Sequence, residues 1–153
     1  MQKKLLLLIA ATCFALIGGA LYMQHAKDML PCPLCVIQRY AFLGIGIFSL
    51  VAAFAKKPGA WLLLAGASAI GGLGTVGKHL YVLAHPGFSC GIDPMETILN
   101  KIPTAEYLPW IFRADGLCEA ATDTVFGLSI PQWSAIAFVA LTITLLVAAL
   151  RRR

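Results

Sequence analysis

The chain is poor in charged residues: Asp, Glu, Lys and Arg make up only 12% of its 153 residues. A soluble domain usually carries about 25% charged residues. Hydrophobic residues account for 59% of the chain, so the composition argues against a soluble protein and favours one that lies in lipid. The length is enough for one domain and not for two, so we expect a single integral membrane domain over residues 1–153.

The chain also lacks a Gly-rich phosphate loop and a basic stripe interleaved with aromatic residues. Its net charge of +5 comes from basic residues that stand in short clusters between long apolar runs. We therefore predict no nucleic-acid partner. Tracts of low complexity and short-period repeats are absent as well.

Four apolar runs occupy residues of about 5–22, 36–55, 60–83 and 130–150. Each approaches the roughly 20 residues that a helix needs to cross the hydrocarbon core of a bilayer. Their composition fits helices rather than lipid-facing strands, which would alternate over about 10 residues. We predict an all-α membrane protein, a bundle of four transmembrane helices. The first run also resembles a signal peptide, but cleavage would leave three spans and an awkward charge distribution.

The distribution of charge predicts the orientation, because basic residues concentrate on the cytoplasmic side. With four spans, seven of the twelve basic residues fall on one side and all seven acids on the other. Both termini should therefore be cytoplasmic, with outer loops of about 24–35 and 84–129. The basic residues on the cytoplasmic side are Lys3, Lys4, Lys56, Lys57 and Arg151–Arg153.

Four of the five cysteines fall on the predicted outer side, which in a bacterium is the oxidising side. Cys32 and Cys35 stand where the second run begins, and Cys90 and Cys118 lie in the longer outer loop. Sequence alone does not fix the pairing of four cysteines. The short spacing favours Cys32 with Cys35, which leaves Cys90 with Cys118. Cys13, inside the first run, is interpreted as a small hydrophobic residue.

The Cys-x-x-Cys sequence has properties that favour redox activity. A disulfide between Cys32 and Cys35 closes a very small ring and gains little from loop entropy. Cys35 opens the predicted helix, where the helix dipole favours a thiolate, and Pro33 stiffens the turn. Arg39 follows Cys35 by four residues and shares its helix face, so its charge would stabilise a thiolate or a bound anion.

Less reactive interpretations exist for the same residues. The outer cysteines could bind zinc, but zinc sites usually use two close pairs, and Cys90 is too far from Cys118 in sequence to form one. We therefore predict no metal. Both pairs could instead be structural disulfides. Arg39 could simply snorkel to the interface, although its register with Cys35 favours a function.

His79 is a further candidate near the outer end of the third run. Because the second helix begins outside and the third ends outside, His79 and Arg39 should lie at similar depth. The imidazole could bond a polar headgroup or shuttle a proton, or it could be a passive interface residue.

The longer outer loop predicts a short helix over about 93–102. Pro94 suits a first helical position, and Pro103 should stop the helix. The apolar, aromatic segment 107–112 prefers the membrane–water interface, so we expect the loop to lie along the membrane. Its cysteines would then stay near Cys32 and Cys35, as direct attack of one sulfur on another requires.

These features together resemble the disulfide bond formation protein B (DsbB) family. The resemblance extends over nearly the whole chain and includes the four spans and two further cysteines in a long second loop. The motifs that carry it are Cys32-Pro33-Leu34-Cys35, Gln38-Arg39 and Gly127-Leu128-Ser129-Ile130-Pro131-Gln132-Trp133.

The resemblance implies a function at the bacterial inner membrane, with the cysteines on the periplasmic side. A reduced periplasmic thiol oxidase of the DsbA type would attack a Cys90–Cys118 disulfide, with Cys90 its partner in the mixed disulfide. The electrons would pass to Cys32–Cys35 and then to a membrane quinone, ubiquinone or menaquinone, beside Cys35. Arg39 matches the family's quinone-site arginine.

His79 matches the family's quinone-site histidine. A paralogue with a dedicated partner and an enzyme similar to vitamin K epoxide reductase share parts of this pattern. The early Cys-x-x-Cys and the later wide pair favour DsbB over the latter. A non-catalytic membrane subunit with structural disulfides is another alternative. A transporter or channel has little support, because only Arg39, Lys78 and His79 bring ionisable groups into the spans.

Overall fold

Four long helices form the body of the protein. The computed structural model describes residues 2–85, 87, 92–118 and 122–151. Each long helix is long and apolar enough to cross a membrane, so the predicted four-helix membrane fold is confirmed. The helices are α1 (Gln2–Ala26), α2 (Pro33–Phe54), α3 (Gly59–Ala84) and α7 (Ile130–Leu150).

Two of the long helices begin at the end of the bundle away from the termini, which the charge pattern predicts to be the outer end and which is called the outer end below. Both have well-defined starts. Helix α2 begins at Pro33, whose missing N–H suits the first helical turn. Cys32 precedes it as the N-cap, and its sulfur accepts a hydrogen bond from the backbone N–H of Cys35 at 3.2 Å. Helix α7 begins after Ser129, whose backbone N–H donates to the Gln132 side chain at 2.8 Å. These contacts occupy backbone groups that the first helical turn leaves without partners.

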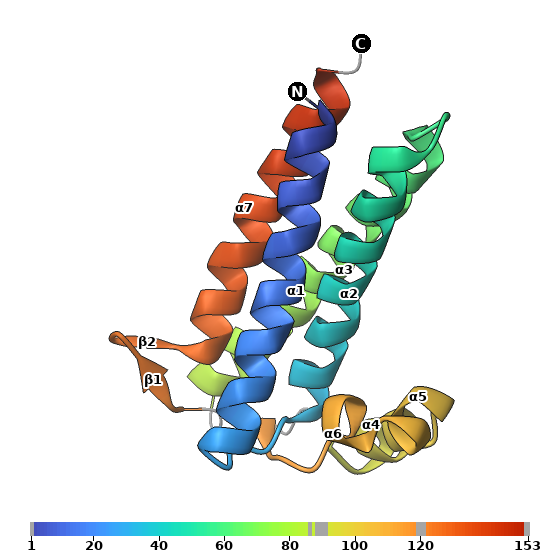
Figure 1. The fold of residues 1–153 in the computed structure, drawn as a ribbon. Coiled ribbons are helices and arrows are strands. Elements are labelled where there is room, and N and C mark those ends of the chain that lie inside the picture. Colours follow the sequence, from blue (N-terminus) through green and yellow to red (C-terminus); the bar gives the residue numbers. More distant parts are fainter. Residues whose placement is uncertain (1, 86, 88–91, 119–121, 152–153) are drawn as a thin grey trace.

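The helices run up and down, as the charge pattern requires. Figure 1 shows the start of α1, the end of α7 and the connection between α2 and α3 at one end of the bundle. The three short helices of the second loop gather at the other end. Among the described residues, Lys3, Lys4, Lys56, Lys57 and Arg151 therefore share one end, which by the charge rule we expect to be cytoplasmic.

The core lies where the four helices meet. Helix α2 packs along both α1 and α3, and α7 packs on α3. The rings of Phe42 and Phe138 stack with centroids 4.1 Å apart, and Gly72 gives Phe138 its space on α3. Small residues at such contacts let membrane helices approach closely. Large apolar side chains such as Leu63, which is 77% exposed, cover the outside, as a surface in contact with lipid requires.

The second loop folds into short elements at the outer end. The predicted helix over 93–102 corresponds to α4 (Ile92–Asn100). Two more helices and a small antiparallel hairpin follow it. They are α5 (Pro103–Tyr107), α6 (Pro109–Phe112), β1 (Thr124–Val125) and β2 (Leu128–Ser129).

Two details of this loop differ from the sequence-based expectation. Pro103 does not only end a helix: it lies in the first turn of α5, where a missing N–H is tolerated. Phe112 is buried and stacks on Tyr40 of α2 at a centroid distance of 4.5 Å. Tyr107, in contrast, is 82% exposed. The aromatic segment therefore divides its rings between the helix bundle and the surface, and its place at a membrane interface stays a prediction.

Two adjacent glycines of α3 provide a matched test of the helix packing. A Cβ on Gly72 would overlap the Phe138 ring, whereas a Cβ on Gly71 would meet nothing within 4 Å. Overpacking costs about 1–3 kcal/mol, whereas Ala gains about 1 kcal/mol over Gly in a helix. We expect Gly72→Ala to lower the melting temperature in detergent and Gly71→Ala to leave it unchanged or raise it. Equal melting temperatures would contradict this packing.

Candidate functional site

The Cys-x-x-Cys pair forms a contact between two free thiols at the outer end of α2. The S–H of Cys32 donates to the sulfur of Cys35, and the two sulfur atoms are 2.8 Å apart. Cys32 is only 1% exposed, whereas Cys35 is partly exposed. The helix start produces this difference, because the N-cap residue turns back over the first turn while Cys35 lies within it.

The surroundings make the two sulfurs chemically unequal. The hydrogen bond to Cys35 and the burial of Cys32 both favour the protonated thiol, and they raise the pKa of Cys32 well above its usual range. Cys35 accepts that hydrogen bond in the first turn of α2, where the helix dipole favours negative charge. Arg39 is close enough to both sulfurs to interact with their charge. Cys35 is therefore the sulfur better placed to be a thiolate.

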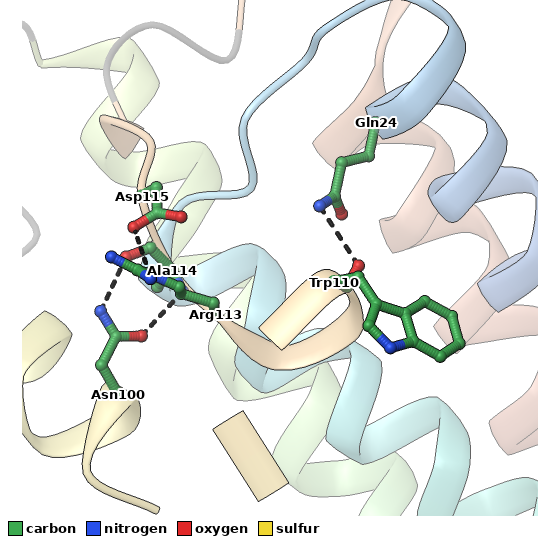
Figure 2. Close-up of polar contacts among 6 residues, drawn as sticks. All are labelled: Gln24, Asn100, Trp110, Arg113, Ala114 and Asp115. Atoms are coloured by element: carbon green, nitrogen blue, oxygen red, sulfur yellow. Dashed lines mark hydrogen bonds and ion pairs between the residues drawn. The ribbon is translucent and has the colours of Figure 1, made fainter. Parts of the chain in front are cut away.

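Hydrogen bonds to α1 and to α6 of the second loop hold the Arg39 side chain in place. Its side chain is 6% exposed, so it does not snorkel to solvent. The guanidinium Nη1 donates to Gln24 Oε1 of α1 at 2.8 Å and to the backbone oxygen of Ile111 in α6 at 2.5 Å. Gln24 in turn donates from Nε2 to the backbone oxygen of Trp110 at 3.3 Å (Figure 2). The second outer loop thus contributes directly to the position of Arg39.

His79 lies directly against the Cys-x-x-Cys pair. It is completely buried, and its Nε2 is 3.7 Å from the sulfur of Cys32. Its Nδ1 is 3.2 Å from the side-chain nitrogen of Gln38 on α2. The ring also hydrogen-bonds the backbone of Cys118. The sequence placed His79 at the right depth, but its contact with Cys32 depends on how α3 packs on α2.

Gln38 is a site residue to which the sequence assigned no role beyond its place in the Gln38-Arg39 motif. It is buried, and its side-chain nitrogen contacts Nδ1 of His79 at 3.2 Å. With the amide in this orientation its nitrogen donates, which suits the His79 tautomer that carries its hydrogen on Nε2. With the amide turned by half a turn, Oε1 suits the tautomer that carries its hydrogen on Nδ1. The available signal was a pair of polar residues, Gln38 and Arg39, in the first turns of an apolar run.

Cys118 lies beside Cys32 and His79 at the same end of the bundle. It is buried and disulfide-bonded, and it packs in one cluster with Cys32, Leu34 and Val82. Cys90, the remaining predicted site residue, lies outside the residues that the structure describes. The fold therefore brings Cys32, Cys35 and Cys118 to one end of the bundle.

Backbone contacts hold the segment before Cys118 in place. The N–H groups of Asp115 and Gly116 both donate to the backbone oxygen of Pro31, at 3.1 and 3.0 Å. The Asn100 side chain exchanges two hydrogen bonds with the backbone of Ala114, at 2.9 and 3.0 Å (Figure 2). The two outer loops are thus joined next to Cys32. Thiol–disulfide exchange between two cysteine pairs needs this nearness.

Comparison with known proteins identifies the family. A family model described as "Disulfide bond formation protein DsbB" matches residues 2–148. The chain belongs to the DsbB family. Three relatives carry the name Disulfide bond formation protein B. The protein of Cupriavidus metallidurans is 50% identical over 152 residues, which cover 99% of this chain and 94% of the relative.

The other two relatives agree with this assignment. The protein of Ralstonia nicotianae is 49% identical over 152 residues, covering 99% of this chain and 96% of the relative. That of Herminiimonas arsenicoxydans is 46% identical over 154 residues, covering 99% and 98%. The resemblance to DsbB is therefore confirmed. It makes the chain a multi-pass membrane protein of disulfide bond formation with disulfide oxidoreductase chemistry.

The inequality of the two sulfurs predicts an order of alkylation. In the reduced protein near neutral pH, we expect N-ethylmaleimide to modify Cys35 at least about ten times faster than Cys32, since each pKa unit changes the thiolate fraction about tenfold. A raised pKa means less thiolate at a given pH, so labelling of Cys32 should increase as the pH rises. Mass spectrometry of timed samples measures both rates. Buried Cys13 serves as the internal reference, and equal rates for Cys32 and Cys35 would refute the asymmetry.

Proposed function

We propose that the protein reoxidises a reduced periplasmic dithiol oxidase of the DsbA type and passes the electrons to a membrane quinone. It would thereby drive disulfide bond formation in periplasmic proteins. The observation that carries this proposal is the cluster in which disulfide-bonded Cys118 packs with Cys32 of the Cys-x-x-Cys pair. Within the proposal, the protein lies in the bacterial inner membrane with these cysteines on the periplasmic side.

The first half of the reaction is exchange between sulfurs. A thiolate of the partner attacks Cys90 in a Cys90–Cys118 disulfide, which forms a mixed disulfide and releases the Cys118 thiolate. The partner's second thiolate then resolves the mixed disulfide, so the partner leaves oxidised and Cys90 and Cys118 are both reduced. One of these two attacks a Cys32–Cys35 disulfide, and resolution restores the loop disulfide and leaves Cys32 and Cys35 as thiols.

The second half is oxidation of the Cys32–Cys35 dithiol at the membrane. A quinone, ubiquinone or menaquinone, takes up two electrons and two protons when it becomes a quinol, which balances the conversion of one dithiol to one disulfide. The residues present fit such a group. Cys35 is the more exposed of the two cysteines and lies in the first turn of the apolar helix α2, where buried Arg39 offers a positive charge near it. Arg39 would stabilise the Cys35 thiolate before the transfer and the negative charge that then develops on the acceptor.

His79 is best placed to act on Cys32. Its Nε2 lies 3.7 Å from the sulfur of Cys32, and the ring is completely buried. In the proposed cycle it would hold or return the proton of Cys32 while Cys35 faces the electron acceptor. A hydrogen bond from His79 to the quinone itself remains a prediction from the family resemblance.

The decisive experiment is quinone reduction by the purified protein in detergent. We expect a soluble ubiquinone analogue to be reduced when a reduced periplasmic thiol oxidase is added, and Cys35→Ser and Cys90→Ser each to abolish the reduction. Cys13→Ser is the matched control, because Cys13 is a buried cysteine of α1 away from this cluster. Absorbance of the quinone follows the reaction. Reduction that survives either site variant, or none while the partner stays reduced, would reject the proposed path.

A second test separates the two halves of the reaction. We expect Arg39→Ala to slow quinone reduction at least about tenfold more than it slows attack by the partner, because the charge acts on the second half. Stopped-flow mixing measures both steps. Arg113→Ala, which removes an exposed arginine paired with Asp115, is the charge control. Gln24→Ala removes a tether of Arg39 and keeps its charge. Equal slowing of both steps by Arg39→Ala would contradict this division.

A further inference from the structure

Three soft ligand atoms meet in the reduced site. The sulfurs of Cys32 and Cys35 and one ring nitrogen of His79 all lie within 4.8 Å of one another. Thiolate and imidazole are the ligands that zinc, and softer ions such as cadmium, prefer in proteins. Tetrahedral zinc bonds of about 2.3 Å to sulfur and 2.0 Å to nitrogen place ligand atoms about 3.5–3.8 Å apart.

Metal binding would require movement of the Cys35 side chain. The sulfur of Cys32 and Nε2 of His79 are 3.7 Å apart, which already suits two ligands of one metal ion. The two sulfurs are 2.8 Å apart, so they would have to separate by about 1 Å. Cys35 is partly exposed in the first turn of α2, and rotation of its side chain is the movement that binding requires.

We propose that reduced Cys32 and Cys35, together with His79, form an inhibitory site for a soft divalent cation such as zinc or cadmium. Three protein ligands hold the ion, and a fourth position stays open. Binding converts two thiols to two thiolates and releases two protons, and no electron is transferred. The disulfide offers no thiolate, so only the reduced protein binds the ion. This site requires the dithiol alone and does not rest on the proposed electron path.

The residues around His79 support its role as a ligand. When Nε2 binds a metal ion, Nδ1 must carry the hydrogen and needs an acceptor. Gln38 contacts Nδ1 at 3.2 Å, and a half-turn of its amide presents Oε1 there in place of Nε2. The same residue therefore serves both tautomers of His79. His79 and Cys32 are fully buried by the packing of α3 on α2, so two of the three ligands are already fixed.

The charge of the site also permits a divalent ion. Arg39 interacts with both sulfurs and would repel an isolated cation. Two thiolates neutralise the double charge of zinc or cadmium, so Arg39 faces a neutral group after binding. A metal ion could therefore inhibit the protein only while Cys32 and Cys35 are reduced.

Cadmium titration of the full-length chain tests the site. The chain carries Cys90→Ser and Cys118→Ser, so that Cys13, Cys32 and Cys35 are the only thiols. After reduction in detergent we expect one cadmium ion per chain, seen by thiolate–cadmium absorbance in the ultraviolet, with two protons released. Zinc should displace it, and protein with an oxidised Cys32–Cys35 pair should bind none. Cys13→Ser should change nothing.

Two variants decide whether His79 is a ligand. We expect His79→Ala to lower the affinity at least about tenfold, since loss of even an outer partner of a ligand costs about 10–100-fold. Gln38→Leu removes the partner of His79 Nδ1 and keeps all three ligands, and it should also weaken cadmium binding. This variant tests the role of His79 if His79→Ala does not fold. Unchanged affinity in a folded variant, or absent binding in the parent, would overturn the proposal. Neither outcome affects quinone reduction measured without metal, so the two proposals fail separately.

Discussion

The start of helix α2 is the constraint on which the rest of the site depends. Pro33 begins the helix and Cys32 caps it, so the phase of every following side chain is set. Cys35 lies in the first turn, and Gln38 and Arg39, being neighbours about 100° apart around the axis, face different partners. Gln38 contacts His79 of α3, and Arg39 contacts Gln24 of α1 and Ile111 of α6. The start of α2 therefore sets the directions of three side chains. Cys35 faces Cys32, Gln38 faces α3, and Arg39 faces α1 and α6.

Polar groups at the edge of a membrane have to find partners within the protein. Gln38, Arg39 and His79 are all buried, and they find those partners in one another and in the outer loops. The loops are therefore part of the site. The carbonyl groups of Trp110 and Ile111 receive hydrogen bonds from Gln24 and Arg39, so movement of the second loop would change the surroundings of Cys35 through Arg39. Binding of a partner to that loop and the chemistry at Cys35 share this physical link.

The sequence predicted what depends on local pattern. Apolar length predicted the four helices, and helical spacing placed Arg39 near Cys35. It could not predict contacts set by the packing of one helix on another, such as the chain of contacts from Gln38 through His79 to Cys32. The burial of Phe112 against Tyr40 was missed for the same reason. A hairpin with Phe126 at a positive φ of 53° was missed as well, because strands of two residues have no periodicity to detect.

The arrangement that makes the two sulfurs chemically unequal also makes the reduced pair a candidate ligand set for a soft metal ion. One thiol is deeply buried against an imidazole and the second is partly exposed, an arrangement that would let one sulfur keep its proton while the other reacts in the proposed cycle. The same three residues offer the ligand atoms of the proposed site for a soft metal ion. Only oxidation removes the thiolates. Exposure to metal therefore depends on how long the pair stays reduced, so an electron acceptor that reoxidises Cys32 and Cys35 quickly would also protect the site.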